Sequence, residues 1–433
     1  MAFRPTAFNL QKLKASKELM PHLFRTEYSK MVAVLIRIFG FEHVETAEDI
    51  SSETFLEAME TWPYKGVPQN PAAWLYAVAK NKAKNHINRR KLFTEKVQPK
   101  VTGTVAHPEV LERSFSAGNI QDSQLQMLFV VCNPAIALDA QVCLALRLLC
   151  GFGLQEIADA LLSNKEAIHK KIHRAKAKLK ALNMGIQMPE LKELPARLNG
   201  VLQAIYLLFS EGYYSQSNDQ VIRMDLCTEA INLAYLLLKN TQTNTHATNA
   251  LLSLMCFHAS RLDARQTEDG ELILYEDQDE AKWSTGLIEK GFYYLQQAAK
   301  WQLISKYYLE ASIAYWHTVK IALPEKWPSI LSLYDALLLI DSAPAIRLNR
   351  IFALSKVHGN QQAILELCKL NLKNNHFYWR LLAELYQETA PDQTMQSLQQ
   401  ALKLCRTKME KRTIESAILK FANRASIVDL YEQ

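Results

Sequence analysis

The residues best suited to bind another molecule are cations, which cluster in two segments of the chain. Residues 65–100 contain nine Lys or Arg and one acid, Glu95. Residues 165–182 contain seven Lys or Arg and one acid, Glu166. Clustered cations neutralise phosphate groups and attract nucleic acid, although a cationic run by itself is often only the solvated face of a helix.

The first cationic segment adds amides and aromatic rings to its charges. Asn70 is a good N-cap and Pro71 suits a first helical turn, so a helix is predicted over residues 70–91. Its predicted outward residues are Trp74, Tyr76, Asn81, Lys82, Lys84, Asn85, Asn88, Arg89 and Arg90. Cations neutralise phosphates, amides hydrogen-bond base edges, and exposed rings stack on unpaired bases. Trp74 is equally suited to anchoring the helix in a core.

The second cationic segment has the pattern of a helix-turn-helix. A short amphipathic helix is predicted over residues 154–161, Ser163 or Asn164 caps the next helix, and that helix covers residues 165–182. Its predicted buried seam is Ile168, Ile172, Ala175 and Leu179, and its outward residues are Lys165, His169, Lys170, Lys171, His173, Arg174, Lys176 and Lys178. An apolar seam with a polar outward face suits a recognition helix in the major groove. The turn lacks the Gly common in this motif, so an ordinary helical hairpin remains an alternative.

An acidic segment precedes both cationic ones. Residues 41–60 contain seven acids and neither Lys nor Arg. Helical spacing puts the acids on one side and an apolar stripe on another, formed by Ala47, Ile50, Phe55, Ala58, Met59 and Trp62. The acids form either the solvated face of a core helix or a docking surface for a basic partner.

These segments lie in a chain whose composition favours helices. Its 433 residues suffice for several domains, and 49% hydrophobic residues can fill their cores. Only 13 Gly and 14 Pro argue against the many tight turns of an all-β protein, so the predicted fold class is all-α. No apolar run reaches the roughly 20 residues of a membrane span and no signal peptide is visible, so the protein is expected to be cytoplasmic. Seven scattered Cys predict reduced thiols rather than disulfides or a zinc site.

The C-terminal part alternates apolar helical segments with short polar breaks, which is typical of helical repeats. The spacing of a first tetratricopeptide helix is matched by Trp379, Leu382, Ala383 and Tyr386, although the repeat period is irregular. The acids between residues 268 and 280 lack the ligand spacing of a calcium loop and are expected to be solvated. No phosphate loop, metal cluster or nucleophile–base pair is visible in the sequence, so we expect no enzyme activity, no metal and no cofactor.

Three segments resemble extracytoplasmic-function (ECF) sigma factors of bacterial RNA polymerase. One is Ala47–Trp62 (AEDISSETFLEAMETW), similar to part of region two, and another is Asn70–Lys91 (NPAAWLYAVAKNKAKNHINRRK), similar to the promoter-melting part of that region. The third is Leu154–Lys180 (LQEIADALLSNKEAIHKKIHRAKAKLK), similar to region four. The C-terminal part resembles the long tetratricopeptide-like extension of one subgroup. The resemblance predicts region two at residues 10–91, a linker at 92–123, region four with its helix-turn-helix at 124–182 and a helical-repeat domain at 195–433.

The resemblance implies a function in transcription initiation, with roles for particular residues. The acidic helix is expected to grip the clamp of the polymerase β′ subunit through Asp49, Glu53 and Phe55. Promoter DNA is expected to contact Trp74, Tyr76, Asn81, Lys82, Asn85 and Arg89 in region two, and Lys165, His169, Lys170, Lys171 and Arg174 in region four. The C-terminal module is expected to regulate initiation by touching the sigma regions or a regulatory protein. The alternatives are a DNA-binding regulator that acts without the polymerase core and a helical-repeat scaffold.

Overall fold

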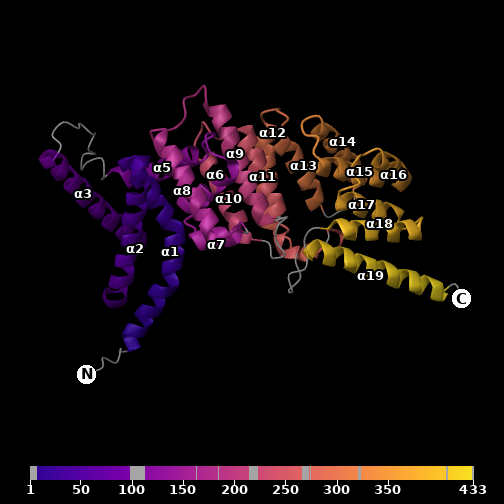
Figure 1. Ribbon diagram of the computed structural model, residues 1–433, viewed down its shortest axis with the longest axis horizontal. Coiled ribbons are helices and arrows are strands. Elements are labelled where there is room, and N and C mark those ends of the chain that lie inside the picture. The colour runs from indigo at the N-terminus through magenta and orange to yellow at the C-terminus, as the bar shows by residue number, and fades with distance from the viewer. Residues whose placement is uncertain are drawn as a thin grey trace. The chain divides into compact units, whose positions relative to one another are not determined.

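The computed structural model describes residues 7–97, 113–161, 163–183, 185–213, 223–265, 273, 275–319, 323–405 and 408–431. All regular elements within these ranges are helices, which confirms the predicted all-α class. The chain divides into two compact units, the first unit at Met1–Leu208 and the second unit at Phe209–Gln433. Figure 1 labels the helices of both.

The first unit contains two groups of helices. The first group is α1 (Ala7–Phe39), η1 (Phe41–His43), α2 (Val44–Lys65) and α3 (Pro71–Val97). The second group is α5 (Ala117–Val131), α6 (Leu138–Leu148), α7 (Leu154–Ala160) and α8 (Lys165–Ala181). A further helix, α9 (Leu194–Tyr213), crosses the boundary between the units. The predicted linker at 92–123 lies partly on α3 and α5 and partly outside the described residues.

Glycines and a cap set the helix ends of the first group. Gly40 and Gly66 have φ angles of 89° and 90°, and their N–H groups donate to carbonyls four residues back at 2.8 and 2.9 Å. Side chains with a Cβ rarely adopt such angles, so the chain leaves α1 and α2 at glycine. Asn70 caps α3 as predicted, because its Oδ1 accepts a hydrogen bond from the Ala73 N–H at 3.0 Å.

Aromatic and aliphatic side chains from α1, α2 and α3 form the core of the first group. Phe24 stacks on Tyr28 with ring centroids 4.6 Å apart and meets Phe55 of α2 at 5.0 Å. Among the described side chains of α3, the fully buried ones are Leu75, Ala79 and Ala83, which recur at intervals of four residues. This core holds α3 against α1 and α2, so that the remaining side of α3 faces solvent.

The second group packs α8 on α6 and α7 through an apolar seam. The seam residues Ile168, Ile172, Ala175 and Leu179 are all buried, as their spacing predicts. Of the two predicted caps the structure uses Asn164, whose Oδ1 accepts from the Ala167 N–H at 2.7 Å. The helices α7 and α8 therefore follow one another across a short turn, with the polar face of α8 turned outward.

The second unit is a succession of helices joined by short connections. Its elements after α9 are α10 (Met224–Leu238), α11 (His246–Ala259), η2 (Leu262–Ala264), η3 (Tyr275–Asp277), η4 (Glu280–Lys282), α12 (Thr285–Ala299), α13 (Lys306–Thr318), α14 (Lys326–Leu338), α15 (Pro344–His358), α16 (Asn360–Cys368), α17 (His376–Tyr386), α18 (Pro391–Leu404) and α19 (Lys408–Tyr431). Helices adjacent in sequence pack on each other, including α11 on α12, α14 on α15 and α17 on α18.

Three apolar clusters follow one another along the C-terminal helices. The first joins α13, α14 and α15 around Ile330, the second joins α15, α16 and α17 around Leu367, and the third joins α17, α18 and α19 around Ala401. Because each cluster shares a helix with the next, these helices form a stack rather than enclosing one central core (Figure 1). The tetratricopeptide-like character of this stack stays a prediction.

The cysteines are mostly core residues, and their reduced state stays a prediction. All seven are free, and all except Cys368 are buried. Separately, no helix in the described ranges is both long and apolar enough to cross a membrane.

Candidate nucleic-acid and partner interface

One side of α3 presents polar groups in a row. Asn81, Asn85 and Arg89 are exposed and follow each other at intervals of four residues. Side chains at this interval are neighbours on a helix surface, with Cβ atoms about 5–6 Å apart. This row, the α3 stripe, offers amides that can pair with base edges beside a guanidinium that can pair with phosphate. Three of the predicted DNA-binding residues therefore share one solvent-facing surface.

Lys82 of the same helix is occupied by acids of α2. Its Nζ lies 3.5 Å from the carboxylate of Glu53 and 3.1 Å from that of Glu57. A predicted DNA contact and a predicted polymerase contact are thus joined to each other. Because the acids are well exposed, each pair stabilises the packing of α3 on α2 by less than about 1 kcal/mol. Because its charge is partly neutralised by these acids, Lys82 attracts a DNA phosphate less strongly than its place in the sequence predicts.

The two aromatic residues of α3 are half-buried rather than freely outward, which corrects their predicted position; their contact with DNA stays a prediction. Trp74 is half-buried and packs edge-to-face on the buried Trp62, with ring centroids 5.4 Å apart. Tyr76 is also half-buried, hydrogen-bonds to the Glu27 carboxylate and lies 5.8 Å from the ring of Phe115. Burial, together with the hydrogen bond to Glu27, raises the pKa of the Tyr76 hydroxyl. Large rings gain free energy by packing on other rings, so Trp74 takes its core-anchoring alternative.

The acidic face of α2 keeps two of the three predicted polymerase contacts at the surface. Asp49 and Glu53 are exposed and lie one helical turn apart. Phe55, in contrast, is 3% exposed and packs on Phe24 and Tyr28. A core side chain cannot reach a partner while its helices stay packed, so the structure removes Phe55 from the docking surface. Its place in the apolar stripe of the acidic segment already pointed to the core.

The outward face of α8 is cationic along its first half. Lys165, His169, Lys170 and Arg174 are exposed there and form the α8 patch. Lys171 is held instead by Asp139 of α6, with Nζ 2.6 Å from the carboxylate. This hydrogen bond lowers the pKa of Asp139 and raises the pKa of Lys171. Lys171 therefore anchors α8 on α6, and the other four predicted residues remain at the surface.

Residues outside the predicted DNA-binding set join α8 to α2, and they include Lys176, whose predicted outward position the structure corrects. The Glu48 carboxylate accepts from Nε of Arg147 at 3.1 Å and from Nζ of Lys176 at 2.5 Å; these two contacts are the Glu48 bridge. Glu48 is 8% exposed, so the bridge is poorly screened by water and salt. At the surface nearby, Lys180 pairs with Glu45 at 2.5 Å. Burial acts to raise the pKa of Glu45, but the hydrogen bond from Lys180, a backbone hydrogen bond and the charges of Lys180 and Lys176 together outweigh it, so the pKa is lowered.

The helical spacing of α2 indicates that Glu48 lies on the buried side of the helix. The buried row of this helix includes Val44, Glu48, Ser51, Phe55, Ala58 and Trp62, which recur at intervals of three or four. An acid in such a row must find partners, because a buried carboxylate without them is very costly. Those partners lie 99 and 128 residues later in the chain, where no local pattern identifies them.

A second set of contacts joins α1 to the second group of helices. The Arg25 guanidinium lies 3.6 Å from the Glu156 carboxylate and 5.0 Å from the ring centroid of Phe152. Arg37 donates to Oγ of Ser123 at 3.4 Å. Together with the Glu48 bridge, these contacts hold the two helical groups in one compact unit.

Comparisons with known proteins match parts of both units. Residues 23–93 match the family model Sigma-70 region 2, and residues 197–299 match a family of unknown function, DUF6596. The uncharacterized protein R00370 of Rhizobium meliloti (strain 1021) is 31% identical over 343 residues, which cover 78% of this chain and 81% of that protein. The ECF RNA polymerase sigma factor BldN of Streptomyces coelicolor is 33% identical over 141 residues, which cover 30% of this chain and 48% of BldN. No solved structure matches the chain.

The Sigma-70 region 2 match covers the helices that carry the exposed acids and the α3 stripe. It begins within α1 and includes all of α2 and most of α3. The likeness to R00370 extends over most of both proteins and so is not confined to this region. The chain therefore belongs to the same family as R00370, and its region 2 makes it a sigma-70-family factor.

Proposed function

We propose that this chain is an ECF-type sigma factor, which binds the RNA polymerase core and directs it to promoters. The Sigma-70 region 2 match and the partial likeness to BldN, which is named as such a factor, support this function. One arrangement carries the proposal: the exposed pair Asp49 and Glu53 lies on α2, next to the helix that bears the α3 stripe. An anionic docking face and a polar DNA-facing row thus stand on adjacent helices of one small group.

Each surface has a distinct part in the proposed mechanism. Asp49 and Glu53 steer and orient the factor on a basic surface of the polymerase clamp. The α3 stripe hydrogen-bonds bases and phosphates as the promoter opens, with Trp74 and Tyr76 supporting α3 from its packed side. The α8 patch contacts the upstream duplex as the outward face of a helix-turn-helix. The polymerase supplies all of the chemistry.

The contacts between α8 and α2 add a conformational step to this mechanism. Lys176 and Lys180 are tied to acids of α2, so they are not available to DNA in the described arrangement. We propose that the two helical groups separate when the factor joins the polymerase, which breaks the Glu48 bridge. Polymerase and DNA surfaces then replace the internal ion pairs, so the step exchanges contacts rather than only losing them.

Binding to purified polymerase core, followed by transcription from a set of genomic promoters, tests the function. The wild-type chain is expected to bind the core and to start transcription. The double variant Asp49→Lys, Glu53→Lys is expected to bind the core at least about tenfold more weakly, because it reverses the docking charge. The first control is the double variant Asp122→Lys, Glu193→Lys, which makes an equal charge change at other exposed sites. The second control is Glu57→Gln, which removes one ion pair of Lys82 and leaves Asp49 and Glu53 unchanged.

The same experiment separates the alternatives. A chain that binds promoter DNA but never the core would be a DNA-binding regulator that acts without polymerase. A chain that binds neither would leave only the scaffold alternative. Equal core binding by the wild type and the Asp49, Glu53 variant would exclude the proposed docking face.

A further inference from the structure

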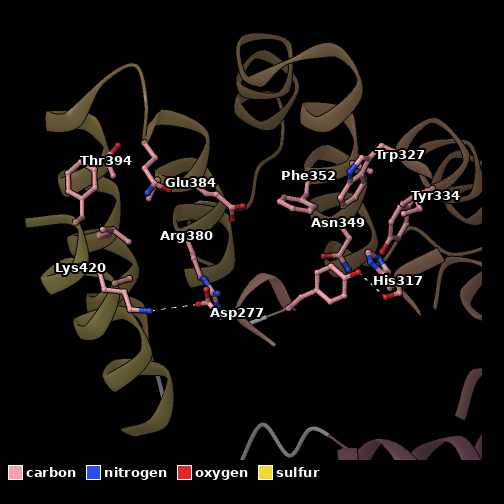
Figure 2. A pocket seen from close by; sticks show the side chains of 18 residues that line it. Asp277, His317, Trp327, Tyr334, Asn349, Phe352, Arg380, Glu384, Thr394 and Lys420 are labelled. Carbon is pink, nitrogen blue, oxygen red and sulfur yellow. Dashed lines mark hydrogen bonds and ion pairs between the residues drawn. The ribbon is translucent and has the colours of Figure 1, made fainter. Parts of the chain in front are cut away.

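The second unit contains a cavity of about 650 Å³ that the proposed sigma function does not use. Seven elements line it, namely η3, α13, α14, α15, α17, α18 and α19. Figure 2 shows side chains from these elements converging on one space. Small-molecule sites usually measure about 300–1,000 Å³ and combine apolar walls with a few polar groups. The cavity has the size and the mixed lining of such a site.

One wall of the cavity is a continuous row of aromatic rings. Tyr275 meets His317 edge-to-face with centroids 5.1 Å apart, and His317 meets Trp327 at 6.1 Å. Trp327 in turn meets Phe352 at 5.6 Å. Figure 2 shows His317, Trp327 and Phe352 on this side of the cavity. These four rings, the ring wall, present a surface against which a flat apolar group can pack.

The opposite side carries charged groups from α17, α19 and η3. Arg380, Lys420 and Asp277 lie together there (Figure 2), and Nζ of Lys420 is 3.8 Å from the Asp277 carboxylate. Within the described chain no ion pair engages the Arg380 guanidinium, although it lines the cavity. Glu384, the other acid of the lining, is exposed to solvent. Asp277 thus pairs with Lys420, which leaves Arg380 able to pair with an anionic ligand.

Further cations lie against the rings of the ring wall. The Arg261 guanidinium is 5.3 Å from the ring centroid of Tyr275, and Nζ of Lys326 is 6.0 Å from the same centroid. Nζ of Lys356 is 4.8 Å from the ring centroid of Phe352. Arg261 is only 7% exposed, and its Nε has no hydrogen-bond partner among the described residues. Water screens the buried Arg261 charge poorly, so its field favours an anion in the cavity.

His317 contributes a hydrogen-bonding group to the ring wall rather than a charge. Burial lowers its pKa to about 3, so the ring is neutral at physiological pH. Its Nδ1 is buried and lacks a hydrogen-bond partner among the described residues. An unsatisfied polar atom in a cavity wall is commonly completed by water or a ligand. The preference for an anion therefore comes from the Arg and Lys side chains.

We propose that this cavity binds a small organic acid with an aromatic body. The aromatic body packs on the ring wall, and the carboxylate pairs with Arg380. A guanidinium suits this role because its planar fork can donate two parallel hydrogen bonds to one carboxylate. Such a ligand would make this sigma-family chain responsive to a small molecule. The proposed binding does not depend on the sigma function, because it concerns the second unit alone.

Calorimetry on the full chain with three matched probes tests the ligand class. Indole-3-propionate has both required groups, tryptamine has the ring with an amine, and acetate has the carboxylate without a ring. Indole-3-propionate is expected to bind at least about tenfold more tightly than either of the others, because only it satisfies both sides of the cavity. Failure of indole-3-propionate to bind at millimolar concentration would overturn the proposal. Binding of a capped Trp-Glu-Glu peptide but not of the small acid would also overturn it, in favour of a peptide site.

Two variants and one control locate the binding. Arg380→Gln is expected to weaken indole-3-propionate binding about tenfold, because it removes the charge-assisted hydrogen bonds. Trp327→Leu is expected to weaken binding by removing part of the ring wall. Trp327 also packs against an apolar cluster, so Arg380→Gln decides the outcome if the Trp327 variant does not fold. The control Arg347→Gln changes an exposed Arg outside the cavity and is expected to bind as the wild type does. Equal affinity of Arg380→Gln and the wild type would rule out the assigned carboxylate partner.

Discussion

The two cationic helices of the first unit, α3 and α8, are both rich in Lys and Arg but differ in which acids these cations pair with. On α3, Lys82 pairs with Glu53 and Glu57, which belong to the neighbouring helix in the same group. On α8, Lys171 pairs with α6 of its own group, whereas Lys176 and Lys180 pair with α2 of the other group. The charge that α3 offers is therefore set within its own group. The charge that α8 offers depends on how the two groups are arranged.

This difference shows that a count of cations overstates the positive charge of a helix surface. Each Lys or Arg that meets a carboxylate adds to packing and subtracts from the field available to phosphate. Among the residues predicted to contact DNA, those that remain exposed are the α3 stripe, with one cation among its three residues, and the α8 patch, with three Lys or Arg and one His. The α3 stripe is thus better suited to reading bases, and the α8 patch to holding the DNA backbone.

The largest effect is expected from Glu48→Gln, which breaks the Glu48 bridge. Arg147 and Lys176 would lose their shared, shielded carboxylate, at a cost of about 3 kcal/mol in the free energy of unfolding. Urea unfolding measures the cost, and hydrogen exchange of α8 amides shows where it falls. Glu45→Gln cuts only the exposed pair with Lys180 and is expected to cost less than about 1 kcal/mol. Equal costs for the two variants would remove the distinction between shielded and exposed contacts.

The next largest effect is expected at the α8 patch. Arg174→Ala should weaken duplex binding at all salt concentrations and reduce the slope of log affinity against log salt by about 1, since it removes one phosphate contact. Lys171→Ala should change that slope much less, because Asp139 already holds Lys171. Fluorescence anisotropy with a labelled promoter duplex measures both slopes. A larger change for Lys171 than for Arg174 would mean that the internal ion pair does not persist on DNA.

A smaller effect is expected when an exposed cation and an ion-paired cation are compared on α3. Arg89→Ala should weaken binding of a forked, partly single-stranded promoter fragment severalfold, because Arg89 is exposed on the α3 stripe. Lys82→Ala should have less effect on this binding, because its charge already meets Glu53 and Glu57. Binding of polymerase assembled with each variant to the forked fragment provides the measurement. Asn88→Ala serves as a control for shortening an exposed side chain on this helix.

The smallest expected effect is a dependence of the packing of α8 on acid pH. The pKa values of Glu45 and Asp139 are lowered in the folded chain from ordinary values of 4.5 and 3.8. A lowered pKa stabilises the folded state above the ordinary value, and this stabilisation is lost as the pH falls through the folded value. Both acids are largely exposed, so each contributes less than about 1 kcal/mol. Urea midpoints measured between neutral pH and about pH 3 should fall less steeply for Glu45→Gln with Asp139→Asn than for the wild type.

The sequence by itself determined the helices of the candidate site and much of their orientation. The caps Asn70 and Asn164 and the buried seam of α8 depend on residues a few positions apart, which a local pattern contains. For the same reason the outward positions of Asn81, Asn85 and Arg89 follow from helical period alone.

Tertiary structure alone decided which outward charges stay available and which rings are covered. Glu48 meets Arg147 and Lys176 only because the chain returns to α2 after 99 and 128 residues. Trp74 and Tyr76 are partly covered by α2, α1 and the approach to α5, and the cavity of the second unit needs seven elements to close. Local spacing selects the side of a helix that a residue occupies, but the groups that lie against that side come from distant parts of the chain. Ion pairing, burial and cavity lining are set by those distant groups.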